Sequence, residues 1–217
     1  MRKAHNVVKR RLIQSVVSPG VRVLDVGCGA GGDIHKWGVP IHACEPDRRS
    51  LLEAIRRGKD TGSTFFLGDI RMVPEENVYD IICYNFSFQY CFESAQLLRD
   101  TLDAVLKRSI VGTKCIGVIP DSVLMFEKYP TWTDAMGNTL EYLCTPEGEF
   151  RECVNVCVLG APYYRTGPKS EPIAHKDRMV TEFARRGFVL EHWAPIVHHT
   201  TGLLTDVYSE FIFVRVE

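Results

Sequence analysis

The sequence of 217 residues lacks the features of membrane, secreted and fibrous proteins. No apolar run reaches the length of about 18 residues that a membrane span needs. Residues 1–14 start with basic side chains but contain no apolar stretch and no small-residue cleavage site, unlike a signal peptide. Internal repeats and low-complexity segments are absent as well. We therefore expect an intracellular protein of the nucleus or cytoplasm that is not secreted.

Metal and disulfide patterns are also missing, although the chain has eight cysteines. None of them forms a C-x-x-C pair, and no second pair accompanies Cys153 and Cys157 at zinc spacing. Cys44, Cys83 and Cys115 lie within apolar runs, where a thiol packs as a small hydrophobe. We expect reduced thiols and no metal.

Net charge is close to zero, at −1, which argues against a general polyanion binder. The local distribution is less even. Residues 1–11 carry five basic side chains and no acid, and residues 48–59 carry five around the single acid Glu53. Each cluster is either a solvated helix face or a surface for a negatively charged partner.

What is present is an ordinary globular composition, with 45% apolar and 24% charged residues. Helical spacing predicts helices over 3–17, 49–57, 93–107 and 176–186, and a further helix through Trp37. Short apolar runs predict strands over 21–26, 40–44, 64–67, 79–86, 115–119, 189–193 and 208–216. This alternation predicts one α/β domain over 1–217, with a mostly parallel sheet, helices on both faces and a closing antiparallel hairpin. The pattern breaks at about 121–170, where we expect an insertion with one or two hairpins.

A glycine-rich loop follows the first strand. Gly27, Gly29 and Gly32 satisfy G-x-G-x-x-G between a strand and a helix, a pattern typical of nucleotide cofactors. Asp25 and Asp33 flank the loop, and two carboxylates there disfavour a pyrophosphate. S-adenosylmethionine has no phosphate. Its sulfonium and ammonium groups suit carboxylates, and its own carboxylate suits backbone N–H groups.

Two more acids follow the next strands along the chain. Glu45 ends the second strand, where an acid reaches ribose hydroxyls, and Asp69 ends the third, where an acid can accept from an adenine amino group. Each acid alone would more often cap a turn. Four acids at successive strand ends predict S-adenosylmethionine as the cofactor and disfavour an NAD-dependent oxidoreductase.

Five segments resemble the mRNA cap guanine-N7 methyltransferases. The most specific matches are VLDVGCGAGGDIHKW at 23–37 and NFSFQYCFES at 85–94. Residues 5–13 resemble the family's Asn-Asn-Trp-x-Lys-Ser-x-Leu-Ile helix, and residues 208–213 resemble its final strand, Tyr-x-x-Phe-x-Phe. Glu171, before a helix, falls where the family carries its guanine-reading Glu.

The resemblance implies a Rossmann-like class I methyltransferase with a seven-stranded sheet, which methylates N7 of the 5′ guanosine cap of mRNA. S-adenosylmethionine would be converted to S-adenosylhomocysteine. The cofactor would be held by Lys9, Asp25, Gly27, Gly29, Asp33, Glu45, Asp69, Ile70, Asn85, Phe86 and Tyr90. The cap guanine would contact Asn6, Phe86, Gln89, Glu171 and Tyr208, and the cap phosphates Arg10, His35 and Lys36. No acid or base is expected, because guanine N7 has a free lone pair and only needs positioning.

The implied partners are capped RNA with a GpppN end and other capping subunits on separate chains, since no Lys-x-Asp-Gly nucleophile segment occurs here. No membrane partner is expected. Several positions depart from the family, with Ala30 for Lys, Gln89 for His, Asn85 for Gln, His5 for Asn and Glu45 for Asp. Such departures are typical of compact, divergent members such as viral ones. They keep two alternatives open: a methyltransferase for another RNA position or a small molecule, and a non-catalytic capping subunit with this fold.

Overall fold

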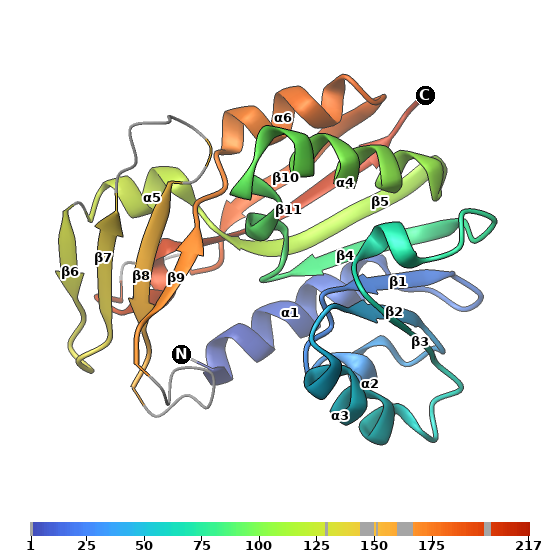
Figure 1. The fold of residues 1–217 in the computed structure, drawn as a ribbon, viewed down its shortest axis with the longest axis horizontal. Coiled ribbons are helices and arrows are strands. Elements are labelled where there is room, and N and C mark those ends of the chain that lie inside the picture. Colours follow the sequence, from blue (N-terminus) through green and yellow to red (C-terminus); the bar gives the residue numbers. More distant parts are fainter. Residues whose placement is uncertain (1, 129, 144–149, 151, 160–166, 198–200) are drawn as a thin grey trace.

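A seven-stranded sheet forms the centre of the computed structural model, which describes residues 2–128, 130–143, 150, 152–159, 167–197 and 201–217 (Figure 1). Its order is β10-β11-β5-β4-β1-β2-β3. The strands are β1 Val23–Val26, β2 His42–Glu45, β3 Thr64–Leu67, β4 Tyr79–Asn85, β5 Ser109–Pro120, β10 Phe188–Pro195 and β11 Tyr208–Arg215. Strands β1 to β5 pair in parallel, whereas β11 runs antiparallel to both β5 and β10. This confirms the predicted sheet and its closing hairpin.

Helices cover both faces of this sheet (Figure 1). One face carries α1 Arg2–Val16, α2 Ile34–Trp37 and α3 Arg48–Gly58, and the other carries α4 Ala95–Lys107 and α6 Lys176–Ala184. Successive strand residues point to opposite faces, so Ile81 joins the apolar cluster of Leu12 in α1 while Ile82 joins that of Leu98 in α4. Within the described part of the chain, no helix is long and apolar enough to cross a membrane.

Element boundaries differ from the predicted ones where local capping decides them. Ser94 Oγ accepts from Leu97 N at 3.1 Å and begins α4 two residues later than predicted, after the short helix η2 Phe88–Glu93. Strand β5 begins at Ser109 rather than at 115, because backbone pairing with β4 continues past the left-handed Gly112. Two further short helices are η1 Ile70–Met72 and η4 Leu204–Val207.

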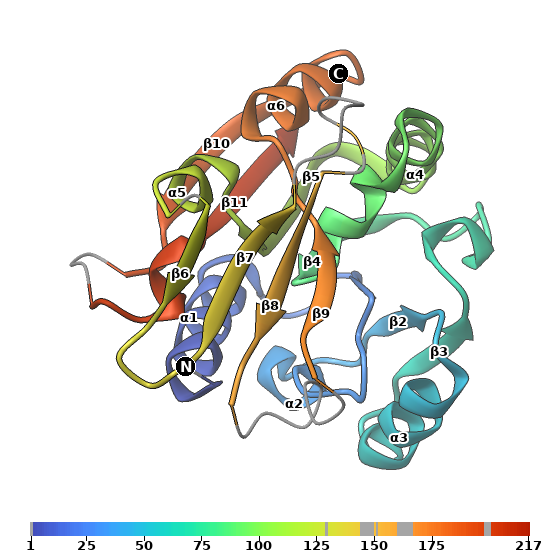
Figure 2. The same ribbon diagram turned by 60° about the vertical axis from the view of Figure 1, so that its left-hand side comes forward.

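The segment where the predicted pattern breaks contains a second, antiparallel sheet (Figure 2). After α5 Ser122–Phe126 come β6 Thr131–Thr133, β7 Thr139–Leu143, β8 Cys153–Cys157 and β9 Lys169–Pro172, in the order β6-β7-β8-β9. On β9, Glu171 lies opposite Val154 of β8, and both are buried. The second sheet therefore turns a carboxylate toward the body of the protein.

The second sheet enters and leaves the main body at one place. Asp121, just after β5, and Ala174, just after β9, form an isolated parallel bridge. The buried Asp121 carboxylate also accepts from Val123 N at 2.9 Å, from Trp193 Nε1 at 2.8 Å and from Ser209 Oγ at 2.6 Å. These bonds join the start of α5 to β10 and β11.

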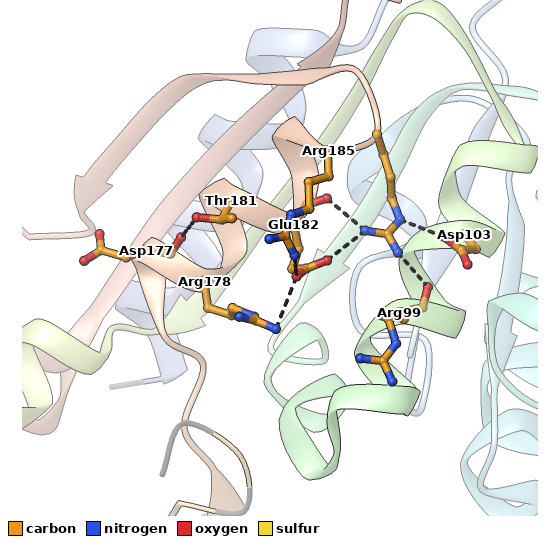
Figure 3. A network of polar contacts seen from close by, with 8 residues as sticks. Arg99, Asp103, Asp177, Arg178, Thr181, Glu182 and Arg185 are labelled. Atoms are coloured by element: carbon orange, nitrogen blue, oxygen red, sulfur yellow. Dashed lines mark hydrogen bonds and ion pairs between the residues drawn. The ribbon is translucent and has the colours of Figure 1, made fainter.

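A buried carboxylate anchors α6, which follows the second sheet (Figure 3). Glu182 is 2% exposed and pairs with Arg185 at 2.7 Å, Arg178 at 3.3 Å and Arg186 at 3.0 Å. Burial disfavours its charge, but these guanidinium groups hold the pKa of Glu182 below its ordinary value. Arg186 also donates to Asp103 of α4 at 2.7 Å, so α6 is tied to its neighbouring helix.

Candidate active site

The glycine loop after β1 has three left-handed residues. Gly27, Gly29 and Gly31 have φ angles of 72°, 54° and 74°, whereas Gly32 has no positive φ. The third glycine of the predicted pattern is therefore not the one that the backbone requires. A Cβ at Gly31 would lie 2.6 Å from Ile34 Cδ1 and 2.9 Å from Ala54 Cα, which explains the absence of a side chain.

Gly29 faces open space. A Cβ at this position would meet no atom within 4 Å, so the glycine keeps a volume free beside the loop. Its N–H donates to Glu45 Oε2 at 2.8 Å, and Asp47 N donates to Glu45 Oε1 at 2.9 Å. These two bonds hold the buried Glu45 carboxylate against the loop, at the end of β2 where it was predicted.

Asp33, at the start of α2, lies in a compact network of charges. Lys9 Nζ lies 2.9 Å from Asp33 Oδ2, Lys36 Nζ contacts Oδ1, and Asn85 Nδ2 donates to Oδ2 at 3.2 Å. Burial alone would raise the pKa of Asp33, yet Lys9 and Lys36 lower it below its ordinary value. Asp33 is therefore ionised, and α1 is joined to the loop through Lys9.

Asp25 lies on β1 beside this network and is 2% exposed. Burial, reinforced by the charge of Asp33, raises its pKa to about 7. Among the described residues, no ion pair neutralises Asp25 as Lys9 neutralises Asp33. A ligand cation next to Asp25 would restore its charge, which is the property expected of a carboxylate that binds an ammonium or sulfonium group.

Asp69 follows β3 at the same edge of the sheet, but its carboxylate already has a partner. Arg71 Nε and Nη2 donate to it at 2.9 Å and 2.5 Å, and Arg71 lowers the pKa of Asp69 although burial opposes this. Ile70 is buried, whereas Tyr90 in η2 is 40% exposed. Of these three predicted residues, Asp69 is thus engaged by Arg71, Ile70 packs in the core, and Tyr90 is partly exposed.

The predicted phosphate contacts lie in different environments. Arg10 and His35 are exposed. Lys36 is not, since its side chain is 7% exposed and Nζ donates to Gly32 O at 2.8 Å as well as contacting Asp33. Lys36 therefore serves the carboxylate network rather than the protein surface.

Three rings contact one another at the end of β4 and form what we call the aromatic cluster: His5, Phe86 and Tyr208. His5 stacks on Phe86 with centroids 4.8 Å apart and planes at 27°, and its edge meets Tyr208 at 4.9 Å. Phe86 and Tyr208 are 5.3 Å apart. Lys9 Nζ lies 5.6 Å from the centre of the Phe86 ring, so the aromatic cluster adjoins the Asp33 network.

Phe86 has a strained backbone. Its φ of 60° is the only left-handed value of a non-glycine residue in the described ranges. Such a conformation costs of order 1–3 kcal/mol and tends to occur at functional sites. Phe86 N donates to Val118 O at 2.8 Å, and this bond holds the turn that directs the ring toward His5 and Tyr208.

The second sheet adds Glu171 to this group. Burial raises the pKa of Tyr208 far above its ordinary value, and the charge of Glu171 raises it further. Glu171 is itself 6% exposed. The charge of Glu171 thus acts on Tyr208, whose ring contacts Phe86, and Asn6 lies in α1 next to His5.

Several buried polar atoms around Phe86 have no partner in the described part of the chain. They are His5 Nε2, Asn85 Oδ1 and Gln89 Oε1. Gln89 is 1% exposed, and its Nε2 donates to Phe86 O at 3.1 Å. An unsatisfied buried polar atom costs about 1–3 kcal/mol, so their concentration around one residue indicates a site that a polar ligand completes.

His5 was not among the predicted site residues. The signal that could have identified it is its spacing, one helical turn before Lys9 in the segment that resembles the family's first helix. For metals, the described residues contain no group of three or more His, Cys, Asp or Glu side chains that could hold an ion.

Comparisons with known proteins add to this geometry. A family model described as "Methionine biosynthesis protein MetW" matches residues 8–121. The chain is 30% identical over 149 residues to the mRNA cap guanine-N(7) methyltransferase of Cryptococcus neoformans, covering 59% of this chain and 24% of that protein. It is also 30% identical over 143 residues to that of Saccharomyces cerevisiae, covering 56% and 32%. The chain thus matches only a quarter to a third of the length of these relatives.

Solved structures share the fold across nearly the whole chain. The PH0226 protein from Pyrococcus horikoshii has a TM-score of 0.71 at 13% identity, covering 99% of this chain and 91% of that one. An S-adenosylmethionine-dependent methyltransferase from Clostridium acetobutylicum has a TM-score of 0.66 at 13% identity, covering 100% and 92%. At these identities the similarity concerns the fold alone.

The fold of the chain is that of the class I S-adenosylmethionine-dependent methyltransferases. The matched model spans more than half of the chain, which therefore belongs to the family of methionine biosynthesis protein MetW. The similarity to cap guanine-N7 methyltransferases, predicted from the motifs, is confirmed by the curated relatives.

Proposed function

We propose that this methyltransferase acts on N7 of the guanosine cap at the 5′ end of mRNA. The observation that carries the proposal is the contact between the Phe86 and Tyr208 rings, together with the buried Glu171, whose charge acts on the Tyr208 phenol. Two aromatic rings and a carboxylate suit a flat base that carries hydrogen-bond donors. Capped RNA is therefore the proposed partner.

The residues around the loop fit S-adenosylmethionine. Gly29 leaves open space, the buried Asp25 lacks a cation, and Asn85 Oδ1 lacks a donor within the described ranges. We assign Asp25 to the cationic groups of the cofactor and Glu45 to its ribose hydroxyls. When bound, the cofactor supplies a methyl group activated by the positive sulfonium.

On the acceptor side, the aromatic cluster would hold the base by stacking, which stabilises binding by about 1–3 kcal/mol per base. Guanine presents N1–H and a 2-amino group as adjacent donors, and a carboxylate accepts both in parallel. Glu171 is a buried carboxylate whose charge acts on Tyr208, and we assign this role to it. It would also stabilise the positive charge that the ring gains on methylation.

Guanine N7 has an available lone pair, so this reaction needs no general base. The protein has only to hold N7 in line with the methyl group, and such positioning supplies about 7–11 kcal/mol of barrier reduction. The site agrees with this demand. The ionised Asp33 is engaged by Lys9 and Lys36, and His5 has a pKa lowered to about 4 by burial and by Lys9.

A second candidate is a methyltransferase for a small molecule, which the family name "Methionine biosynthesis protein" favours. The matched range ends at residue 121, before Glu171 and Tyr208. It therefore covers the cofactor loop together with Phe86 and Gln89, whereas Glu171 and Tyr208 lie beyond it. Glu171 and Tyr208 are the features that favour a base as acceptor.

The test is transfer of label from S-adenosylmethionine to short RNAs ending in an unmethylated guanosine cap, an N7-methylated cap or a triphosphate. We expect label on N7 of the unmethylated cap only. Glu171→Gln should abolish transfer and keep cofactor affinity within a few fold, while Glu141→Gln, an exposed carboxylate of the same sheet, should remain active. Transfer to the N7-methylated cap would indicate another RNA position. Bound cofactor without any RNA methylation would favour the small-molecule candidate.

A further inference from the structure

His5 lies in the first turns of α1 and forms part of the aromatic cluster. Its ring is stacked on Phe86 and meets Tyr208 edge-on. The helix that carries it is fixed by the Lys9–Asp33 ion pair and by the buried Val8 and Leu12. The imidazole is therefore held at a defined position in the aromatic cluster. His5 is the member of this cluster that was not among the predicted site residues.

The Nε2 atom of His5 is enclosed and has no partner among the residues that the structure describes. The side-chain amide donors nearby already have acceptors, since Asn85 Nδ2 donates to Asp33 and Gln89 Nε2 donates to Phe86 O. Burial and the charge of Lys9 lower the pKa of His5 to about 4, so the ring is neutral at pH 7. A neutral ring adds no repulsion to a base that becomes positive on methylation.

Guanine presents three groups on one edge: O6 as an acceptor, then N1–H and the 2-amino group as donors. A carboxylate can accept from the two donors but repels O6. A base read by Glu171 alone would leave O6 without a donor in a site shielded from water.

We propose that His5 is a specificity-determining residue whose Nε2–H donates a hydrogen bond to O6 of the acceptor guanine. The inference rests on the proposed function and adds a hydrogen-bond donor for O6, the third group on that edge of guanine. Glu171 and His5 together then distinguish guanine from adenine, whose amino group at position 6 would face the His5 donor.

The experiment compares RNAs capped with guanosine or with 6-thioguanosine, which keeps N1–H and the 2-amino group but presents a weak acceptor at position 6. We expect wild type to lose about tenfold in kcat/KM on the sulfur-substituted cap, as for loss of one hydrogen bond. His5→Phe keeps stacking but has no donor, so it should raise KM for the guanosine cap by about tenfold and no longer distinguish the two caps. His5→Asn, which restores an N–H, should recover most of the affinity.

Affinity for S-adenosylhomocysteine, measured by calorimetry, and thermal unfolding should stay unchanged in both His5 variants and in the control Gln14→Ala, an exposed position of α1. An active wild type that ignores the sulfur substitution overturns the role of His5 while the proposed function stands, even if His5→Phe fails to fold. A lowered KM in a His5→Ala variant also overturns it, because the ring would then only obstruct the place that the base takes. A wild type that methylates neither cap overturns the proposed function and the role of His5 together.

Discussion

At the scale of single residues, Asp25 and Asp33 show how position decides the chemistry of one residue type. Both are buried, but Lys9 and Lys36 accompany Asp33 whereas Asp25 has no such cation in the described part of the chain. Their pKa values move in opposite directions as a result. A single structure thus holds one carboxylate charged and leaves the other to be charged by a ligand.

Asp25→Asn should change the pH dependence of stability. The folded-state pKa of Asp25, about 7, lies above its ordinary value of 3.8, so the stability it contributes at low pH is lost as the pH rises through 7. Relative to wild type, the variant should gain up to about 1.4 kcal/mol per pH unit between pH 4 and 7 and then level off. Urea unfolding across this range without cofactor measures it, and parallel profiles would contradict it. Calorimetry should show loss of cofactor binding.

Residue types could be predicted at the site more reliably than their partners. The sequence places Asp25, Asp33 and Glu45 at the loop because strand ends of a parallel sheet converge at one edge. It does not reveal that Lys36 turns back onto Asp33, since that depends on the short α2 and on side-chain packing. The role of His5 was hidden for the same reason.

At the scale of elements, the loop between β1 and α2 separates two demands on glycine. Gly31 lies against Ile34 and the backbone of Ala54, so its constraint is packing between helices. Gly29 borders open space, so its constraint is room for a ligand. The sequence pattern identified the loop but assigned the third position to Gly32, because spacing alone cannot show which peptide is left-handed.

Two matched variants separate these demands. Gly31→Ala should lower the free energy of unfolding by about 2–4 kcal/mol, because the methyl group overlaps backbone and the φ is strained. Gly29→Ala should cost only about 1 kcal/mol of backbone strain but weaken cofactor binding at least about tenfold by filling the open space. Urea unfolding and calorimetry with S-adenosylhomocysteine give the two values. Normal cofactor affinity in Gly29→Ala would disprove the assignment of the loop.

The sequence predicted the strands of the main sheet by their residue ranges. For the second sheet it predicted only one or two hairpins, without ranges for the strands. Strands β1 to β5 have short apolar runs and adjoining helices, a pattern that repeats along the chain. Strands β6 to β9 are three to five residues long, and only alternate side chains are buried, as in Cys153–Cys157. Such strands carry little signal of their own, so Glu171 could be placed only by resemblance.

At the scale of the whole molecule, the near-zero net charge predicts weak salt dependence. Each phosphate contact of a single strand contributes about 0.7 to the slope of log affinity against log salt. With Lys36 engaged by Asp33, we expect kcat/KM for capped RNA to vary with a slope of only about −1 to −2. Arg10→Ala should reduce that slope by about 0.7, whereas Lys59→Ala, at an exposed position just after α3, should leave it unchanged. A steep slope in wild type would reveal a larger basic contact surface.

The bridge between Asp121 and Ala174 has a consequence for how such enzymes diversify. Because the intervening segment departs and returns at adjacent points, its length and contents can change without moving the ends that the core must accommodate. The cofactor loop, β1 and β2 lie outside that segment, and Glu171 lies inside it. Evolution can thus exchange the segment that carries Glu171, the proposed guanine-reading residue, while the glycine loop, β1 and β2 are inherited intact.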